Sequence, residues 1–343
     1  MMKVQSFVIL FIVIHIIVPL QIFDEAIHHD NFAYWSGYKV IKETNSITSS
    51  YEFFGRFPEI LLPVIYWIIS VTFGNISLHS IIIVHVTLFS VLYPIAIITF
   101  SRYLRKENLL SVKTTPYFIC TALAVCPFGL PLQLTRQTLA FCICVIFLSK
   151  ILLWKRVFLS FITKSILFAT THIFSISNIL VFSKPFKQRL IQLFIITAIL
   201  SILYSTFISN LIISRLLQVQ WGLTDEPILS RYYLIILFIL FIYLTFFVAT
   251  NRLTWGFLIF FVSFLIISVF SIFIFKRLFY GMEFFFPIAL LFIHLNQFEV
   301  KQEQPRFHRK INITNANMQI AFVISSGLFF SKIVYAILQL FEI

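Results

Sequence analysis

Long apolar runs follow one another along almost the whole chain, from Val4 to Leu340, with only short polar breaks between them. A bilayer hydrocarbon core about 30 Å thick needs about 20 apolar residues for each helical span. Backbone groups in lipid must be hydrogen-bonded within their own segment, and runs of this length achieve that as helices rather than as barrel strands. The chain is therefore predicted to be an all-α, polytopic transmembrane bundle with roughly ten or eleven spans.

Composition supports the same conclusion. Of the 343 residues, 60% are hydrophobic and only 11% are charged. A soluble globule of this composition could not cover its surface with polar groups. We expect a single integral membrane domain over residues 1–343. The first apolar run has no small-residue cleavage site, and we interpret it as an uncleaved span.

Ten of the apolar runs are clear enough to assign as spans. An eleventh segment, 173–182, is too short to cross unless the bilayer is locally thinned. The ten runs are 4–22, 79–100, 115–130, 138–153, 157–171, 190–209, 232–249, 253–275, 279–295 and 318–340.

Four connections between these runs are basic, and the positive-inside rule places all four in the cytoplasm. Segment 173–182 must then cross or nearly cross, as half of a broken helical pair hinged near His172 that lines a polar cavity. The last connection, 297–316, is the longest basic cytoplasmic loop. The four groups are Arg102, Arg105, Lys106 and Lys113; Lys150, Lys155 and Arg156; Lys184, Lys187 and Arg189; and Lys301, Arg306, Arg309 and Lys310.

The same parity argument applies to residues 59–73, which are apolar enough to be another span. Lys3 and the Arg102 connection share the cytoplasmic side, so an even number of crossings must separate them. Two spans already lie between them. We therefore expect 59–73 to be an interfacial amphipathic helix within an outer loop, 23–78, with Tyr66 and Trp67 at headgroup level.

The formal net charge of +13 does not indicate nucleic-acid binding, because the basic residues are scattered singly and form no stripe. The cysteines all lie inside apolar runs, and we interpret them as buried apolar side chains rather than as a disulfide or metal site. They are Cys120, Cys126, Cys142 and Cys144.

The outer loop begins DEAIHHDNFAYWSGYK, with carboxylates, histidines and aromatic rings in one short stretch. Aromatic faces stack on sugar rings, and a carboxylate can remove a hydroxyl proton. Asp30, Tyr34 and Trp35 are the candidates for these roles. The alternative is an ordinary solvated loop with interfacial Tyr and Trp.

Arginines at outer span ends are the candidates for anion binding. Arg136 enters a span with Gln137 beside it, and its planar fork fits a phosphate bidentately. Arg277 stands at another outer end with Tyr280 nearby, while Arg215 and Arg231 border a second outer loop, 209–231. The alternative is snorkelling of the charged group to the headgroups.

His172 could act as a base, a phosphate donor or a helix-terminus contact, or it could be a structural residue. The sequence has no Walker loop, HExxH cluster, GxSxG or dinucleotide fingerprint, so we expect no cofactor and no metal.

Together these features resemble the EpsG-type and Wzy-type polysaccharide polymerases of bacterial envelopes. An acidic and aromatic first outer loop carries the resemblance, followed by a glutamate that opens an apolar stretch, an Arg-Gln pair, a His at a helix break and a late Arg and Tyr. The matching residues here are Asp30 to Tyr38, Glu59, Arg136 and Gln137, His172, and Arg277 and Tyr280.

The resemblance implies a multi-pass protein of the bacterial inner membrane with an outward-facing active site, similar in arrangement to GT-C glycosyltransferases. It implies a polymerase that joins undecaprenyl-pyrophosphate-linked oligosaccharide repeat units into O-antigen, capsule or exopolysaccharide. Its partners would be this lipid-linked substrate, membrane lipid, and the chain-length regulator and flippase of the pathway.

In this hypothesis Arg136, Arg277, Arg231 and Arg215 bind the pyrophosphate, and Tyr34, Trp35, Gln137 and Tyr280 bind sugar. Asp30 leads as the proton acceptor, ahead of Glu59 and His172. One alternative is a GT-C-type glycosyltransferase that adds one sugar from a polyprenyl-phosphate donor. Another is a lipid-linked oligosaccharide flippase or transporter.

Overall fold

In the computed structural model, the chain is described over residues 4–21, 29–50, 60–126 and 135–151. Thirteen further single positions are described as helical: 163, 166, 167, 288, 289, 292, 293, 323, 327, 330, 334, 337 and 338. Within these residues the secondary structure is helical throughout, with no strand. The all-α prediction is therefore confirmed for this part of the chain.

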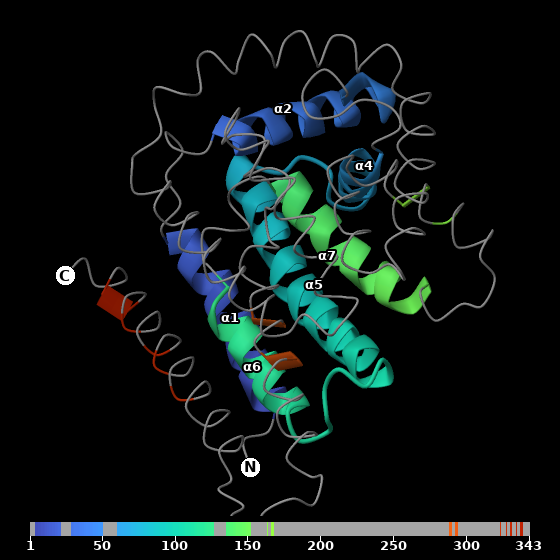
Figure 1. Cartoon of the computed structure of the whole chain (residues 1–343). Coiled ribbons are helices and arrows are strands. Elements are labelled where there is room, and N and C mark those ends of the chain that lie inside the picture. Colours follow the sequence, from blue (N-terminus) through green and yellow to red (C-terminus); the bar gives the residue numbers. More distant parts are fainter. Residues whose placement is uncertain are drawn as a thin grey trace, which may run out of the picture. The chain divides into compact units, whose positions relative to one another are not determined.

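The helices alternate with short connections (Figure 1). Their bounds are α1 Val4–Gln21, α2 His29–Thr44, the 3-10 helix η1 Thr48–Ser50, α4 Leu61–Phe73, α5 Leu78–Lys106, α6 Thr115–Ala124 and α7 Thr135–Ile151. The chain forms two compact units, residues 1–55, 63–146 and 281–343 in the first and 56–62 and 147–280 in the second. The first unit holds α1, α2, α5 and α6 with most of α4 and α7.

Helix α5 begins and ends with recognisable capping motifs. The Ser77 hydroxyl accepts a hydrogen bond from the Ser80 backbone N–H at 3.1 Å. At the other end Asn108 takes the left-handed conformation, with φ of 57°, while its N–H donates to the Arg105 carbonyl and the Leu109 N–H donates to the Leu104 carbonyl. This is a Schellman motif, which ends the helix. The last helical residue, Lys106, lies six residues beyond the predicted end at 100.

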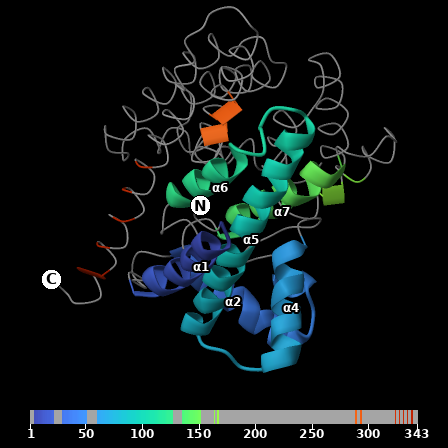
Figure 2. The ribbon, with the colours of Figure 1, turned by 90° about the horizontal axis from the view of Figure 1, so that it is seen from below.

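The bundle of α1, α5 and α6 is covered at one end by two crosswise helices. Figure 1 shows α2 lying across this end, and α4 viewed along its own axis, while Figure 2 shows α4 lengthwise. Helices α5 and α7 begin at the end that α2 covers and run away from it (Figure 1). Residues 61–73 thus lie crosswise to α1, the arrangement expected of a helix that does not span; its position at a membrane surface stays a prediction.

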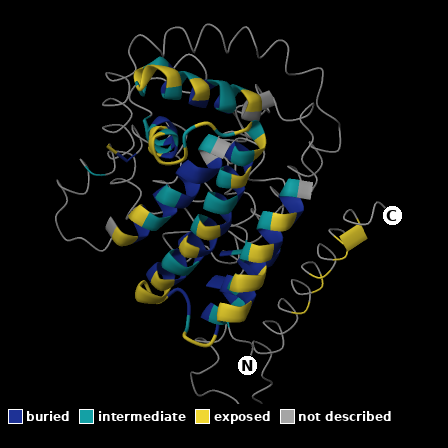
Figure 3. Cartoon of the chain, turned by 180° about the vertical axis from the view of Figure 1, so that it is seen from behind, coloured by how far each residue is buried: buried dark blue, intermediate teal, exposed yellow. Residues whose placement is uncertain are grey.

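Helices α1 and α5 bury apolar side chains and also expose apolar ones. The exposed side of α1 carries Ile9, Val13 and Ile17, and that of α5 carries Val91 and Ile95. Figure 3 shows exposed positions recurring along the helices between buried and intermediate ones. Several polar side chains are buried among the helices as well: His15, His85, Ser90, Ser101, Thr121 and Thr138.

Among the described residues, α5 is the one helix that is both long enough and apolar enough to cross a membrane. Helices α1, α4, α6 and α7 contain shorter apolar stretches. The remaining predicted spans lie wholly or largely outside the described residues, so the polytopic arrangement stays a prediction.

Helix α6 ends at Ala124, six residues before the predicted 130. Pro127 disfavours helical conformation in the residue before it, Cys126, and so favours an early end. The His15 imidazole of α1 meets the end of α6: Nε2 lies 3.3 Å from the Cys126 carbonyl, and Nδ1 lies 3.0 Å from the Phe11 carbonyl. The buried His15 imidazole thus lies within hydrogen-bonding distance of a carbonyl just beyond the end of α6.

The expected burial of the cysteines is confirmed. All four cysteines are buried, and no disulfide joins any of them in the described residues.

Candidate functional site

The segment 29–44, predicted as part of a loop, is the helix α2. Its buried side chains are Tyr34, Tyr38 and Ile41, which recur at i, i+4 and i+7 and form one helical face. This periodicity was present in the sequence, but the polar composition around it favoured a loop interpretation. The acidic and aromatic residues of the candidate site are therefore held on a packed helix.

Four side chains, which we call the tyrosine–histidine cluster, pack beneath α2: Tyr34 and Tyr38 of α2, Tyr66 of α4 and His85 of α5. The Tyr66 hydroxyl oxygen lies 2.5 Å from His85 Nε2, and the two rings stack with centroids 5.7 Å apart. Tyr34 meets the His85 ring edge-on at 5.6 Å, and Tyr38 meets Tyr66 edge-on at 6.1 Å. One imidazole therefore joins three helices.

Burial keeps the phenol groups of Tyr38 in α2 and Tyr66 in α4 uncharged. It raises the pKa of Tyr66 well above its ordinary value, with a further contribution from neighbouring Tyr34. Burial also raises the pKa of Tyr38. Both phenols therefore remain protonated donors at neutral pH.

Helix α2 is also bonded to the connection between α4 and α5. The Tyr38 hydroxyl donates to the Gly74 carbonyl, and the Trp35 indole N–H donates to the Ile76 carbonyl at 3.3 Å. Gly74 has a φ of 70°, a left-handed conformation that suits glycine. At the far end of α2, the Trp67 indole donates to Asn45 Oδ1 at 2.9 Å.

Tyr66 was expected at headgroup level, but it is fully buried in the cluster. Trp67, its neighbour, is exposed as expected. The apolar residues Ile68, Val71 and Phe73 share its exposure, so α4 turns one apolar face inward and leaves another apolar face uncovered by the described chain.

The expected sugar-stacking residues differ in accessibility. Tyr34 is only 6% exposed, and its ring packs on His85, so it offers no open face to a sugar. Trp35 is half-buried, and the Lys39 ammonium lies 3.8 Å from its ring centroid. Phe32, 52% exposed and 5.7 Å from Trp35, is an accessible ring that the sequence analysis did not single out.

Arg136 lies in the first turn of α7 and is partly buried. The amino-terminal end of a helix carries a partial positive charge from its unpaired N–H groups. An arginine there adds a full charge, so the start of α7 suits an anion such as phosphate. This helix end lies at the end of the bundle covered by α2 (Figure 1).

Asp30 lies in the first turn of α2, one helical turn ahead of Tyr34, and Gln137 follows Arg136 in α7. The α2 end of the bundle thus brings together the helices that carry Asp30, Trp35, Arg136 and Gln137. Six predicted site residues lie outside the described part of the chain: Glu59, His172, Arg215, Arg231, Arg277 and Tyr280.

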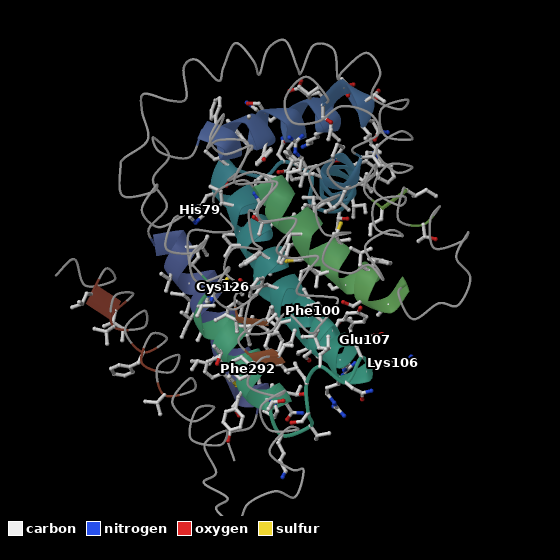
Figure 4. The ribbon with its side chains drawn as sticks, in the orientation of Figure 1. His79, Phe100, Lys106, Glu107, Cys126 and Phe292 are labelled. Atoms are coloured by element: carbon white, nitrogen blue, oxygen red, sulfur yellow. The ribbon has the colours of Figure 1, made fainter. Side chains whose placement is uncertain are left out.

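The opposite end of the bundle is basic. Figure 4 shows His79 near the α2 end of α5, and Lys106 and Glu107 at the other end. Arg102, Arg105, Lys106 and Lys113 are all exposed there. Four exposed basic side chains therefore gather at the end of the bundle opposite α2.

Comparison with known proteins finds no matching family model, no matching curated protein and no matching solved structure.

Proposed function

We propose that the chain is a multi-pass protein of the bacterial inner membrane that joins undecaprenyl-pyrophosphate-linked oligosaccharide repeat units at the outer face, as EpsG-type and Wzy-type polymerases do. The observation that carries the proposal is that Arg136 at the start of α7 and helix α2, which carries Asp30 and several aromatic residues, lie at the same end of the bundle. An arginine at the start of a helix can bind a diphosphate, whereas carboxylate and aromatic side chains can bind and deprotonate a sugar acceptor.

The exposed apolar side chains support placement in a membrane. Isoleucine and valine side chains exposed along α1 and α5 would each cost free energy in water, whereas hydrocarbon accommodates them. Polar residues such as Ser90 and Thr138 are buried among helices, where membrane bundles keep them.

The basic end supports the orientation. Lys and Arg concentrate on the cytoplasmic side, so the end with Arg102 and Lys106 would face inward and α2 would face outward.

This orientation predicts the labelling of single introduced cysteines in intact cells by a membrane-impermeant maleimide. Glu43→Cys, exposed on α2, should react from outside. Lys106→Cys, exposed at the other end, should react only after permeabilisation. The native cysteines are buried and give little background. Reaction of Lys106→Cys in intact cells would contradict the orientation.

The proposed reaction replaces one bond at the anomeric carbon of the donor. The acceptor hydroxyl oxygen bonds to this carbon, the bond from the carbon to the pyrophosphate oxygen breaks, and the hydroxyl proton passes to the Asp30 carboxylate. Arg136 neutralises the departing lipid diphosphate, with Arg277, Arg231 and Arg215 proposed to assist. Phe32 and Trp35, both in α2, would stack on sugar rings.

Deleting the gene tests this function. The surface glycan, run on a gel, should lose its ladder of repeats, and single repeat units should accumulate on the lipid carrier. Expression of the intact chain should restore the ladder. A glycan shortened by one sugar in every repeat would indicate a GT-C-type transferase instead, and an unchanged ladder would refute both enzymes.

One observation favours a transporter as the second candidate. Helix α6 ends after ten residues, and its carboxyl end is met by the buried His15. Discontinuous helices whose ends face polar groups are typical of transporters. Purified protein in vesicles that moves lipid-linked substrate across the bilayer without extending it would support this candidate over the polymerase.

A further inference from the structure

In the tyrosine–histidine cluster, one side chain of α5 touches rings from both crosswise helices. His85 of α5 hydrogen-bonds Tyr66 of α4 and meets Tyr34 of α2 edge-on. Tyr34 stands one turn after Asp30 in the same helix. The imidazole is therefore one of the groups that hold α2 in place, together with the hydrogen bonds of Tyr38 and Trp35 to the connection between α4 and α5.

The hydrogen bonding of the cluster is incomplete. His85 is fully buried, yet its Nδ1 has no hydrogen-bond partner among the described residues. The Tyr66 hydroxyl can donate to His85 Nε2 or accept from it, depending on the histidine tautomer. In either case Nδ1 has no partner among the described residues. An unpaired buried polar atom destabilises a fold, and apolar rings of the same shape would avoid that loss. A cluster serving stability alone would thus be better built from phenylalanines.

What the polar pair adds is a fixed geometry. A hydrogen bond sets the distance and angle between two rings, whereas apolar rings can slide past each other at little cost. Buried polar pairs can specify a unique packing at the expense of stability.

We propose that His85 is a positioning residue: through its hydrogen bond to Tyr66 and its edge contact with Tyr34, it fixes α2 and α4 on α5 and so holds the Asp30-bearing helix in register with the site. The activity part of this inference rests on the proposed polymerase function. The geometric part stands on the cluster alone.

The test compares helix placement, stability and activity in the full chain. Nitroxide labels at Glu43→Cys on α2 and Arg105→Cys on α5, both exposed positions, report the distance between the two helices by pulsed electron resonance. The variant Tyr66→Phe/His85→Phe removes both polar partners together and keeps the rings. We expect its label distance distribution to broaden while its melting temperature stays unchanged or rises.

Polymer formation should fall in the same double variant, on the order of 100-fold, because displacement of a catalytic group by about 1 Å has an effect of that size. His85→Gln, whose amide oxygen can accept from Tyr66, should keep the narrow distribution and restore most of the polymer. Tyr93→Phe is the matched control: it removes another buried hydroxyl from α5, one that donates to the Ala122 carbonyl, and should change neither measurement.

A narrow label distribution in the double variant would overturn the inference, whatever happens to the polymer. A broadened distribution with normal polymer would support the positioning role and contradict the proposed site on α2. Should the double variant fail to fold, Tyr66→Phe and His85→Gln decide the matter: equal label distributions in these two would overturn the inference, and broadening in Tyr66→Phe alone would support it.

Discussion

Replacing Arg136 with alanine should abolish the long glycan ladder and leave single repeat units on the lipid carrier. The guanidinium stands in the first turn of α7, where its charge adds to the positive end of the helix dipole. In the proposed mechanism it meets charge that develops on the departing diphosphate. Loss of one such donor typically lowers turnover by about 100- to 1,000-fold. Gel analysis of surface glycan, with quantification of lipid-linked repeat units, measures the effect.

Two companion variants make this prediction specific. Arg136→Lys keeps the charge but loses the planar fork, so we expect partial activity. Arg102→Ala removes an exposed arginine from the opposite end of the bundle and should leave the ladder intact. Normal ladder length in Arg136→Ala, or equal loss in Arg102→Ala, would exclude Arg136 as the diphosphate-binding residue.

Replacing Phe118 with alanine should cause the largest loss of stability. Phe118 of α6 is fully buried, and its ring lies 6.4 Å from Phe100 of α5 and 5.8 Å from Phe292 by centroid distance. Truncation of a buried phenylalanine costs about 3–5 kcal/mol in soluble proteins. For the membrane protein proposed above we expect about 3 kcal/mol, the lower end, because lipid rather than water would solvate the separated helices and the loss would be mainly of packing.

Thermal unfolding in detergent measures this loss, with a thiol-reactive dye that reports exposure of the buried cysteines. Phe73→Ala is the matched control, since Phe73 is 70% exposed at the end of α4. Its effect should stay within about 0.5 kcal/mol. Similar losses in the two variants would mean that Phe118 does not pack as the structure describes.

Apolar runs predicted the course of the described helices better than their ends. The start of α1 and the presence of α5 and α7 follow from run length alone. The end of α5 does not, because Arg102 and Arg105 interrupt the apolar run while the helix continues to Lys106 and is ended by the backbone motif at Asn108. The early end of α6 was readable from Pro127 but was outweighed by the apolar residues after it.

The candidate site was predictable in part. Arg136 stands out because a charge entering an apolar run needs an explanation, and α2 stands out by its acidic and aromatic residues. His85 does not, because a single histidine in an apolar run has no local signature. Its importance comes from Tyr34 and Tyr66, which two other helices bring to it. Contacts of that kind depend on tertiary packing, which spacing along one helix does not encode.

The short helix α6 has a consequence for how the chain is built. Ten residues of helix extend only about 15 Å, half of a hydrocarbon core, so in a bilayer its carboxyl end would stop near the midplane. Figure 4 shows Cys126 between the two ends of the bundle. The ribosome completes α1 before α6, so the His15 imidazole has been synthesised when the Cys126 carbonyl, 3.3 Å from its Nε2 in the folded chain, is added. In the proposed bilayer, the order of elements along the chain thus provides a polar group near the midplane before the carbonyl that it contacts.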